Sequence, residues 1–180
     1  MIQLAPLQAR DLAPLTLLAN TPEVKDAFAF EADIVREQDV AEMLVRATPG
    51  TISRTWTILT GERVVGCISL VNMHPVQRSG EITNRVLSPG AGWLVGLKAV
   101  ERVARIGFME LGLHRIETRI HGDNRASLLL CERLKRRGLV NEGTRRQSAW
   151  RAGAWHDVVL YAILREDYQE SEDADLSPIA

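Results

Sequence analysis

The chain has 180 residues, of which 46% are hydrophobic and 25% charged, so its length and composition are those of one compact globular domain. Its two cysteines, Cys67 and Cys131, are too few for a disulfide framework, and with four scattered histidines they form no zinc-binding pattern. No apolar run approaches the roughly 18 residues of a membrane span, and no signal-peptide pattern opens the chain. We therefore expect a cytoplasmic protein that binds no metal ion and no membrane.

The formal net charge of −1 hides an uneven distribution of charge along the chain. The stretch Glu166–Ala180 holds six acidic residues and no lysine or arginine, and we expect residues 169–180 to form an acidic, disordered tail after a single domain of residues 1–168. Between Arg102 and Arg151 the chain carries 12 basic and 5 acidic residues. Such a segment can contact phosphate groups or can simply be a solvated surface, and the sequence leaves both interpretations open.

Hydrophobic periodicity and turn residues predict strands and helices along the whole chain. In chain order we expect a strand (2–7), a helix (8–20), a short helix from Thr21, a third helix (36–47), a hairpin (55–70), a strand (81–87), a loop and helix (88–111), a strand (114–120), a helix (124–138) and two strands (139–150 and 155–164). This order predicts an α/β domain with one mixed sheet.

The centre of this order is a strand–loop–helix–strand unit, whose loop and first helical turns read SPGAGWLVGLKAV from Ser88 to Val100. In such a sheet a ligand belongs at the carboxyl end of the strand that leads into the helix. The helix N-terminus adds unpaired N–H groups and the positive end of a dipole. The position of the loop therefore favours a phosphorylated ligand.

Four stretches carry a resemblance to a known family: GEITNRVLSP, AVERVARIGFMELGLHRIETRIHGDNRASLLLCERL, GLVNEG and WHDVVLYAILREDY. Over residues 56–168 the chain resembles the GNAT superfamily of N-acetyltransferases, and within it the Rim type, which acetylates the N termini of ribosomal proteins and has many small-molecule relatives. The resemblance implies a mostly antiparallel mixed sheet of about six to seven strands, with helices on both faces and a splayed parallel pair of strands around Thr83 and Ile116. It also implies acetyl-CoA as the donor and a small-molecule or peptide amine as the acceptor.

In this family a loop of the pattern Gln/Arg-x-x-Gly-x-Gly/Ala holds the CoA pyrophosphate, and the pattern falls here on residues 91–96. Ala91 stands where the family has a basic or amide residue, and Leu94 replaces a glycine whose missing side chain lets the backbone approach phosphate. We therefore expect weak binding of acetyl-CoA. The resemblance assigns donor contacts to Val86, Leu87, Ser88, Ala91, Gly92, Trp93, Leu94, Val95, Gly96 and Asn124.

The altered loop leaves two other interpretations open. The chain could use another donor, such as an acyl- or aminoacyl-tRNA or a carrier-protein thioester, in small-molecule biosynthesis, or it could be a non-catalytic ligand-binding protein. A tRNA donor needs a basic surface, and the helix over 124–138 carries about one more turn than is typical of the family, rich in basic residues. The residues predicted for an RNA-binding surface are Arg133, Lys135, Arg136, Arg137, Arg145 and Arg146.

Acyl transfer to an amine needs a base for the ammonium, a hydrogen-bond donor for the oxyanion and an acid for the leaving group. By resemblance Glu81 matches the acidic residue that begins the corresponding Rim-type strand, and Asn84 on the same strand could orient the acceptor or a water. Ser127 and Cys131 share a helix face. Cys131 falls where many GNAT enzymes place a tyrosine that protonates the leaving thiolate, although the Rim type often lacks this tyrosine. The alternatives are a strand-end carboxylate for Glu81 and a buried apolar side chain for Cys131.

Overall fold

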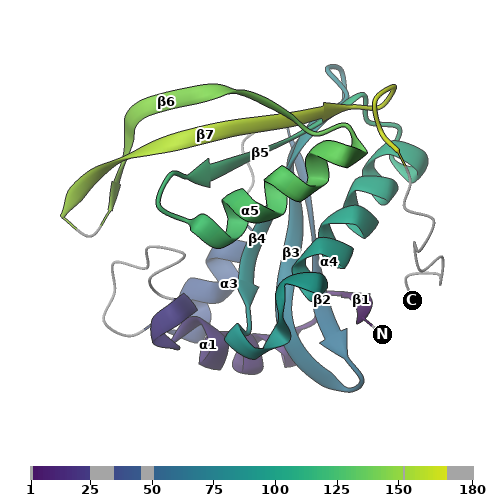
Figure 1. Cartoon of the computed structure of the whole chain (residues 1–180). Helices are drawn as coiled ribbons and strands as arrows, with labels where there is room; N and C mark the ends of the chain where they lie inside the picture. Colours follow the sequence, from purple (N-terminus) through teal and green to yellow (C-terminus); the bar gives the residue numbers. More distant parts are fainter. Residues whose placement is uncertain (1, 25–34, 46–50, 152, 170–180) are drawn as a thin grey trace.

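The structure, a computed structural model, describes residues 2–24, 35–45, 51–151 and 153–169, and its strands form one seven-stranded sheet (Figure 1). The strands lie in the order β1-β2-β3-β4-β5-β7-β6. Their bounds are β1 (Ile2–Pro6), β2 (Ile52–Thr60), β3 (Arg63–His74), β4 (Ser79–Leu87), β5 (Arg115–His121), β6 (Val140–Arg151) and β7 (Ala154–Leu164). The helices are α1 (Leu12–Ala19), α3 (Glu37–Val45), α4 (Trp93–Arg105) and α5 (Arg125–Leu134).

β4 and β5 are parallel neighbours, whereas the other described strand pairs are antiparallel. The parallel pairing is short and ends at Glu81 of β4 and Glu117 of β5. Beyond this point β4 stays paired with β3 as far as Leu87, and β5 stays paired with β7 as far as His121. The two strands therefore separate toward their carboxyl ends, which confirms the predicted splayed parallel pair.

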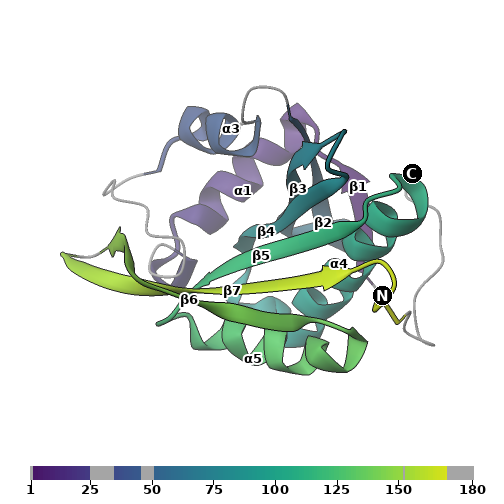
Figure 2. The same ribbon diagram turned by 90° about the horizontal axis from the view of Figure 1, so that it is seen from above.

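Helices cover both faces of the sheet, with α4 and α5 on one face and α1 and α3 on the other (Figure 2). The main core lies between the sheet and α4 and includes the fully buried side chains of Ile68, Val103 and Phe108. A smaller core under α1 and α3 includes Leu15 and Val40. The predicted mixed sheet with helices on both faces is confirmed.

Two glycines set how the helices meet the sheet. Gly107 lies in a π-helical turn, Ile106–Glu110, that continues α4, and a Cβ at this position would lie 2.6 Å from Cδ1 of Ile116 on β5. Its missing side chain lets the turn pack directly on the strand. After α5 a 3₁₀ turn over Lys135–Arg137 forms the extra turn predicted from the sequence, and Gly138 ends it with a φ of 96°.

The two edge strands of the sheet are β1, which has 5 residues, and β6. β6 is exposed along most of its length, and its pairing with β7 shifts register between Arg145 and Ala149. Within this bulge Gln147 has a φ of 46°, and its N–H donates a hydrogen bond of 2.8 Å to Oδ1 of Asp157. The bulge therefore breaks the regular edge in its middle.

Two sequence predictions lie partly outside the described residues. The helix expected from Thr21 starts with residues 22–24, and residues 25–34 are not described. The acidic tail is described only to residue 169. In the part of the chain that the structure describes, no helix combines the length and the apolar character needed to cross a membrane.

Candidate active site

The site is built around the opening between β4 and β5. β4 ends at Leu87 and leads into α4 at Trp93, and β5 ends at His121 and leads into α5 at Arg125. Both helices therefore begin at the carboxyl ends of the separating strands (Figure 1). Because the first N–H groups of a helix lack intrahelical partners and lie at the positive end of its dipole, this end of the opening suits an anionic ligand.

The loop before α4 turns on a glycine. Residues Pro89–Ala91 form a 3₁₀ turn, and Gly92 follows as the N-cap of α4 with a φ of 77°. This left-handed conformation is readily adopted only by glycine. Gly92 is therefore required for the entry of the chain into α4, whatever ligand the loop meets.

The side chains of this loop divide into an exposed and an inward-facing set. Trp93 and Leu94, in the first turn of α4, are 52% and 51% exposed. Ala91 and Val95 pack against the main core, and Gly96 is buried. A phosphate that approaches the loop would thus meet backbone N–H groups beside two bulky apolar side chains, and no side chain from 88 to 96 is cationic.

At the end of β4, successive backbone N–H groups point alternately toward β3 and toward the opening beside β5. The N–H of Ser88 donates to the carbonyl of Val65 on β3 at 2.6 Å, so this predicted donor contact is occupied by the sheet. Because successive N–H groups of a strand point to opposite sides, the N–H of Leu87 faces the opening toward β5. The side chains of Asn84 and Val86, both predicted site residues, lie outside the described part of the chain.

Asn124 is the N-cap of α5. Its Oδ1 accepts a hydrogen bond of 3.1 Å from the N–H of Ser127. The cap uses only the oxygen of the amide, so the NH₂ group remains available as a hydrogen-bond donor. Ser127, also a predicted site residue, is partly buried in the first turn of α5.

Glu81 lies at the vertex of the opening, where parallel pairing stops, and it is 5% exposed. Its neighbour Ile82 belongs to the main core on the side of α4, so Glu81 faces the opposite side of the sheet. Arg119 of β5 donates from Nε to Oε1 of Glu81 at 3.0 Å and from Nη2 to Oε2. The hydrogen bond with Glu81 raises the pKa of Arg119, although burial opposes this.

Arg119 is a site residue that the sequence reasoning missed. It lies on the same face of β5 as Glu117, which pairs directly with Glu81. The alternating pattern of β5 could have indicated this face, but the partner strand and its register could not be read from the sequence. The ion pair joins β4 and β5 beyond the end of their backbone pairing.

Thr83 continues the same face of β4 beyond Glu81. Its Oγ1 is buried and makes no hydrogen bond to any residue that the structure describes. Its register partner Ser69 is already engaged, because the hydroxyls of Ser69 and Thr55 lie 2.8 Å apart. A buried hydroxyl without a partner costs free energy, so Thr83 offers a hydrogen bond to a substrate or a water.

A polar cluster lies at the carboxyl end of β5. Asp123 accepts from Arg151, with an Nη2–Oδ2 distance of 3.2 Å, and Nδ1 of His156 lies 3.5 Å from the same oxygen. His121 lies beside them, and its buried Nδ1 has no hydrogen-bond partner within the described ranges. Burial, with the nearby charge of Arg151, lowers the pKa of His121, so its imidazole is neutral at pH 7.

Cys131 lies in the main core and is 3% exposed. Burial, together with the nearby charge of Glu132, raises the pKa of the thiol to about 12. The thiol therefore stays protonated at neutral pH and is not a nucleophile. These properties fit the alternative of a small buried side chain.

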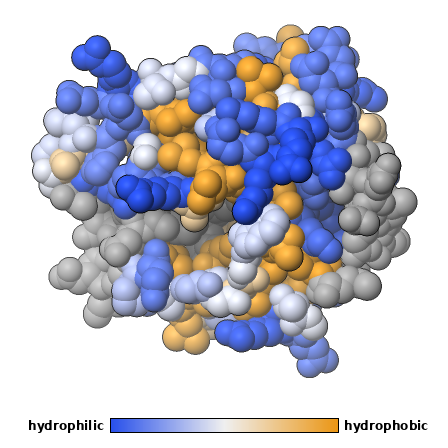
Figure 3. Space-filling view, in the orientation of Figure 1, coloured by the Kyte–Doolittle hydropathy of each residue, from blue (hydrophilic) through white to orange (hydrophobic). Residues whose placement is uncertain are grey.

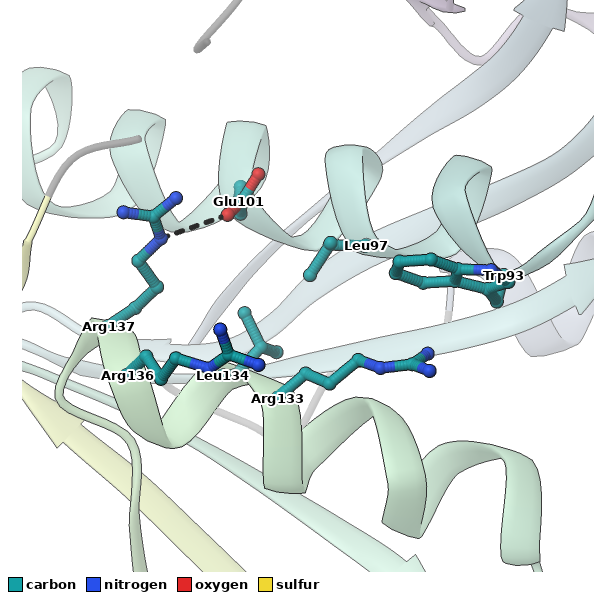
Figure 4. Close-up of a pocket in the computed structure, with 7 residues that line it drawn as sticks. All are labelled: Trp93, Leu97, Glu101, Arg133, Leu134, Arg136 and Arg137. Atoms are coloured by element: carbon teal, nitrogen blue, oxygen red, sulfur yellow. Dashed lines mark hydrogen bonds and ion pairs between the residues drawn. The ribbon is translucent and has the colours of Figure 1, made fainter. Parts of the chain in front are cut away.

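A groove of about 360 Å³ runs between α4 and the end of α5 (Figure 4). Trp93 and Glu101 come from α4, and the guanidinium carbon of Arg133 lies 4.0 Å from the centroid of the Trp93 ring. Nε of Arg137 lies 3.3 Å from Oε1 of Glu101. The residues that line the groove are Trp93, Leu97, Glu101, Arg133, Leu134, Arg136 and Arg137.

Only three of the six basic residues predicted for an RNA-binding surface line this groove. Arg133, Arg136 and Arg137 line it, whereas Lys135, in the 3₁₀ turn after α5, pairs with the exposed Glu132 at 2.8 Å. Arg145 and Arg146 lie on the exposed edge strand β6 and do not line the groove.

In the view of Figure 3, hydrophobic residues gather in the middle of the face that carries α4 and α5, with hydrophilic residues around them. Within the described residues, no three His, Cys, Asp or Glu side chains are grouped to hold a metal ion.

Comparisons with known proteins match most of the chain. A family model described as "Acetyltransferase (GNAT) domain" matches residues 2–137. The curated protein named "Putative ribosomal N-acetyltransferase YdaF", from Bacillus subtilis (strain 168), is 29% identical over 104 residues, which are 58% of this chain and 55% of YdaF. YokL of the same organism, named as an SPbeta prophage-derived uncharacterized N-acetyltransferase, is 27% identical over 84 residues, 47% of this chain and 46% of YokL. The alignments thus span about half the length of these relatives.

The arrangement of the chain also matches solved structures. The spermidine N-acetyltransferase from Vibrio cholerae, in complex with CoA and spermine, aligns with a TM-score of 0.76 at 22% identity, over 93% of this chain and 97% of that one. At this identity the likeness concerns the fold. The region that the family model matches, residues 2–137, includes the opening between β4 and β5 and the N-termini of α4 and α5.

Proposed function

Since the chain belongs to the GNAT family of acetyltransferases, we propose that it transfers an acetyl group from acetyl-CoA to a primary amine of a small molecule or a peptide. The observation that carries this proposal is the separation of β4 from β5 beyond Glu81 and Glu117, with two helix N-termini at the open end. The separated strands leave backbone groups free for the amides of a pantetheine arm, and helix N-termini suit its phosphates.

The reaction forms a bond from the amine nitrogen to the acetyl carbon and breaks the carbon–sulfur bond, and the proton lost by the nitrogen ends on the CoA thiol. We assign proton removal to Glu81, directly or through a water, because its carboxylate lies at the vertex of the opening on the face away from α4. Asn84 is assigned to orient the acceptor. The N–H of Leu87 faces the opening and is the candidate donor to the oxyanion.

The donor side of the site is assigned to α5 and to the loop before α4. We assign the NH₂ group of Asn124 to the pantetheine arm because the helix cap engages only the amide oxygen, and Ser127 lies in the same turn. The backbone N–H groups of residues 92–94 are the candidate contacts to the pyrophosphate. We assign Cys131 to packing because its thiol is buried in the core.

The test of this proposal is acetyl transfer itself. Release of the CoA thiol from acetyl-CoA would be followed with a panel of amines and peptides, and native mass spectrometry would compare acetyl-CoA with charged and uncharged tRNA. The proposal expects a complex with acetyl-CoA and amine-dependent thiol release. Binding of charged tRNA without binding of acetyl-CoA would support the other donor, to which the reported relatives lend no support.

A further inference from the structure

His121 is a half-buried histidine that has no role in the proposed reaction. It is the last residue of β5, at the open end of the separation from β4. Ile116 and Ile120 of the same strand pack in the main core beside α4, so Arg119 and His121 face the opposite side of the sheet. Glu81 faces that side too and is bound there by Arg119. His121 therefore lies on the same face as the proposed base.

The imidazole of His121 is not engaged by the protein. Its Nδ1 is buried, and neither ring nitrogen hydrogen-bonds to any residue in the described ranges. The neighbouring His156 differs, because its Nδ1 lies 3.5 Å from a carboxylate oxygen of Asp123 and its Nε2 lies 3.2 Å from the carbonyl oxygen of Arg151. A neutral imidazole has one nitrogen with a free lone pair. In His121 this lone pair is available to accept a proton.

The surroundings of His121 keep its ring neutral. The nearest charged and titratable groups are Arg119 on β5, Asp123 in the turn before α5, Arg145 and Arg151 on β6, and His156 on β7. Burial is the main cause that lowers the pKa of His121, and the charges of Arg151 and His156 add to it against the effect of Asp123. At pH 7 the ring is therefore uncharged and can accept a proton.

Acetyl transfer to an amine has two protons to remove. Primary amines of peptides and lysine titrate between about 7.7 and 10.4, so at pH 7 most of the acceptor arrives as an ammonium ion. An ammonium has no lone pair, so one proton must leave before the nitrogen attacks, and the second leaves afterwards and ends on the CoA thiol. Both oxygens of Glu81 already accept hydrogen bonds from Arg119. A second proton acceptor on the same face would let different groups carry the two transfers.

We propose that His121 takes the first proton from the acceptor ammonium. The N–H bond of the ammonium breaks, the proton moves to the free ring nitrogen, and the electron pair stays on the amine nitrogen as the nucleophile. The imidazolium then gives its proton to water, which can reach it because Gly122 and Asp123 are exposed. The inference rests on the proposed function for the reaction itself. It makes His121 a catalytic residue whose step precedes the one assigned to Glu81.

The test compares the pH dependence of kcat/KM for the acceptor in the wild type and in His121→Asn, at saturating acetyl-CoA and with a lysine-like amine. The wild type can use the ammonium, so its value should change little from pH 7 to the pKa of the amine. The variant depends on free amine, whose fraction rises about tenfold per pH unit. The wild type should therefore exceed the variant about 10²-fold at pH 7, and the two should converge toward about pH 10. A purely structural role of His121 would give the same ratio at every pH.

The matched control is His156→Asn, which removes a histidine of the same cluster whose two nitrogens are both engaged. Its ratio to the wild type should not change with pH. A weakly basic amine, already neutral at pH 7, should react equally well with the wild type and with His121→Asn. A pH-independent ratio for His121→Asn, or an equal loss with the neutral amine, would overturn the inference and leave the proposed function intact.

A second measurement needs no acetyl transfer. In an NMR titration the ring signals of His121, assigned by their loss in His121→Asn, should titrate below the ordinary value of 6.5. They should also shift when the lysine-like amine is added at pH 7. Titration above 6.5, or no shift with an amine that the enzyme acetylates, would overturn the inference. Normal titration of His121 without thiol release from any amine would instead count against acetyl transfer itself, and with it against this role.

Discussion

Glu81 is a buried carboxylate whose direction is fixed by two hydrogen bonds from one guanidinium. Burial of a carboxylate is unfavourable without such a partner. Arg119 reaches it from the strand across the opening, and about half of the Arg119 side chain remains exposed. The pair therefore stabilises the vertex of the site and leaves one side of the arginine accessible.

Glu81→Gln separates the chemical from the structural role of this carboxylate. If Glu81 removes the amine proton, kcat should fall by about 10²-fold. The matched control is Glu117→Gln, because Glu117 lies opposite Glu81 on β5 and pairs with Arg115. Turnover near the wild-type value at saturating substrate would exclude Glu81 as the base.

Arg119→Gln tests the structural half of the pair. The variant leaves a buried carboxylate without its charged partner, so the free energy of unfolding in urea should fall by about 1–3 kcal/mol. Arg63→Gln, which removes an exposed arginine, should leave that free energy nearly unchanged. An equal effect of the two variants would show that Arg119 contributes little.

The raised pKa of the Cys131 thiol predicts how the free energy of unfolding changes at alkaline pH. Its thiol has a pKa near 9.0 when unperturbed and about 12 in the folded chain. The stabilisation due to the neutral buried thiol is complete below pH 9 and is lost as pH rises toward 12, because the unfolded chain ionises first. Between pH 9 and 11 the wild type should lose more unfolding free energy than Cys131→Ala. Parallel curves for the two proteins would contradict this expectation.

At the scale of elements, the start of α5 combines a cap with a proposed ligand contact. Asn124→Ala should lower the free energy of unfolding by about 1 kcal/mol and should raise KM for acetyl-CoA. Asn124→Ser restores a capping oxygen but no NH₂ donor, so it should recover stability without recovering KM. Recovery of both by serine would show that the amide makes no contact with the donor.

The ends of the helices give a second prediction, based on two glycines. Gly112 has a φ of 66° with open space around it, so alanine there should cost about 1 kcal/mol for the backbone conformation alone. Gly138 has a φ of 96°, and a Cβ would lie 2.1 Å from the carbonyl oxygen of Asp167. Gly138→Ala should therefore lose about 1–3 kcal/mol more than Gly112→Ala in urea unfolding. Equal losses would rule out the close contact.

Most of the elements follow from local sequence pattern, and the exceptions have physical reasons. β3 extends to His74 and β4 begins at Ser79, so the hairpin between them is longer than the predicted strands. The turn between the two strands, residues 75–78, begins with Pro75, and a hydrogen bond from the Arg78 N–H to the His74 carbonyl closes it. Pairing with a neighbour outweighs local propensity in such segments.

The geometry of the candidate site is harder to predict from the sequence than the helices and strands are. Asn124 can be predicted because a cap is a local pattern, and its partner Ser127 is three residues away. Glu81 and Arg119 are 38 residues apart, so their contact depends on the register of two strands. Predicting the groove would also require knowledge of how α4 packs against the extra turn after α5. Such features come from tertiary structure and leave no local signal.

At the scale of the whole molecule, donor binding should raise thermal stability. Acetyl-CoA at 100 times its Kd should stabilise the folded chain by about 2.7 kcal/mol. The double change Ala91→Arg with Leu94→Gly supplies a cation and removes an exposed side chain at the loop, so it should bind more tightly and give a larger rise in Tm at the same acetyl-CoA concentration. Each protein's own Tm without ligand is the control. No rise for either protein would argue against CoA as donor.

The bulge in β6 bears on how the folded chain behaves at high concentration. An edge strand with a long regular row of free backbone groups invites pairing with other chains and, through them, aggregation. Here the register shift between Arg145 and Ala149 interrupts that row, and Arg145 and Arg146 add like charges that repel a second copy. The opposite edge is the short β1, which contains Pro6. Both ends of the sheet are thus poor templates for added strands, so fibril growth from the native state should be slow.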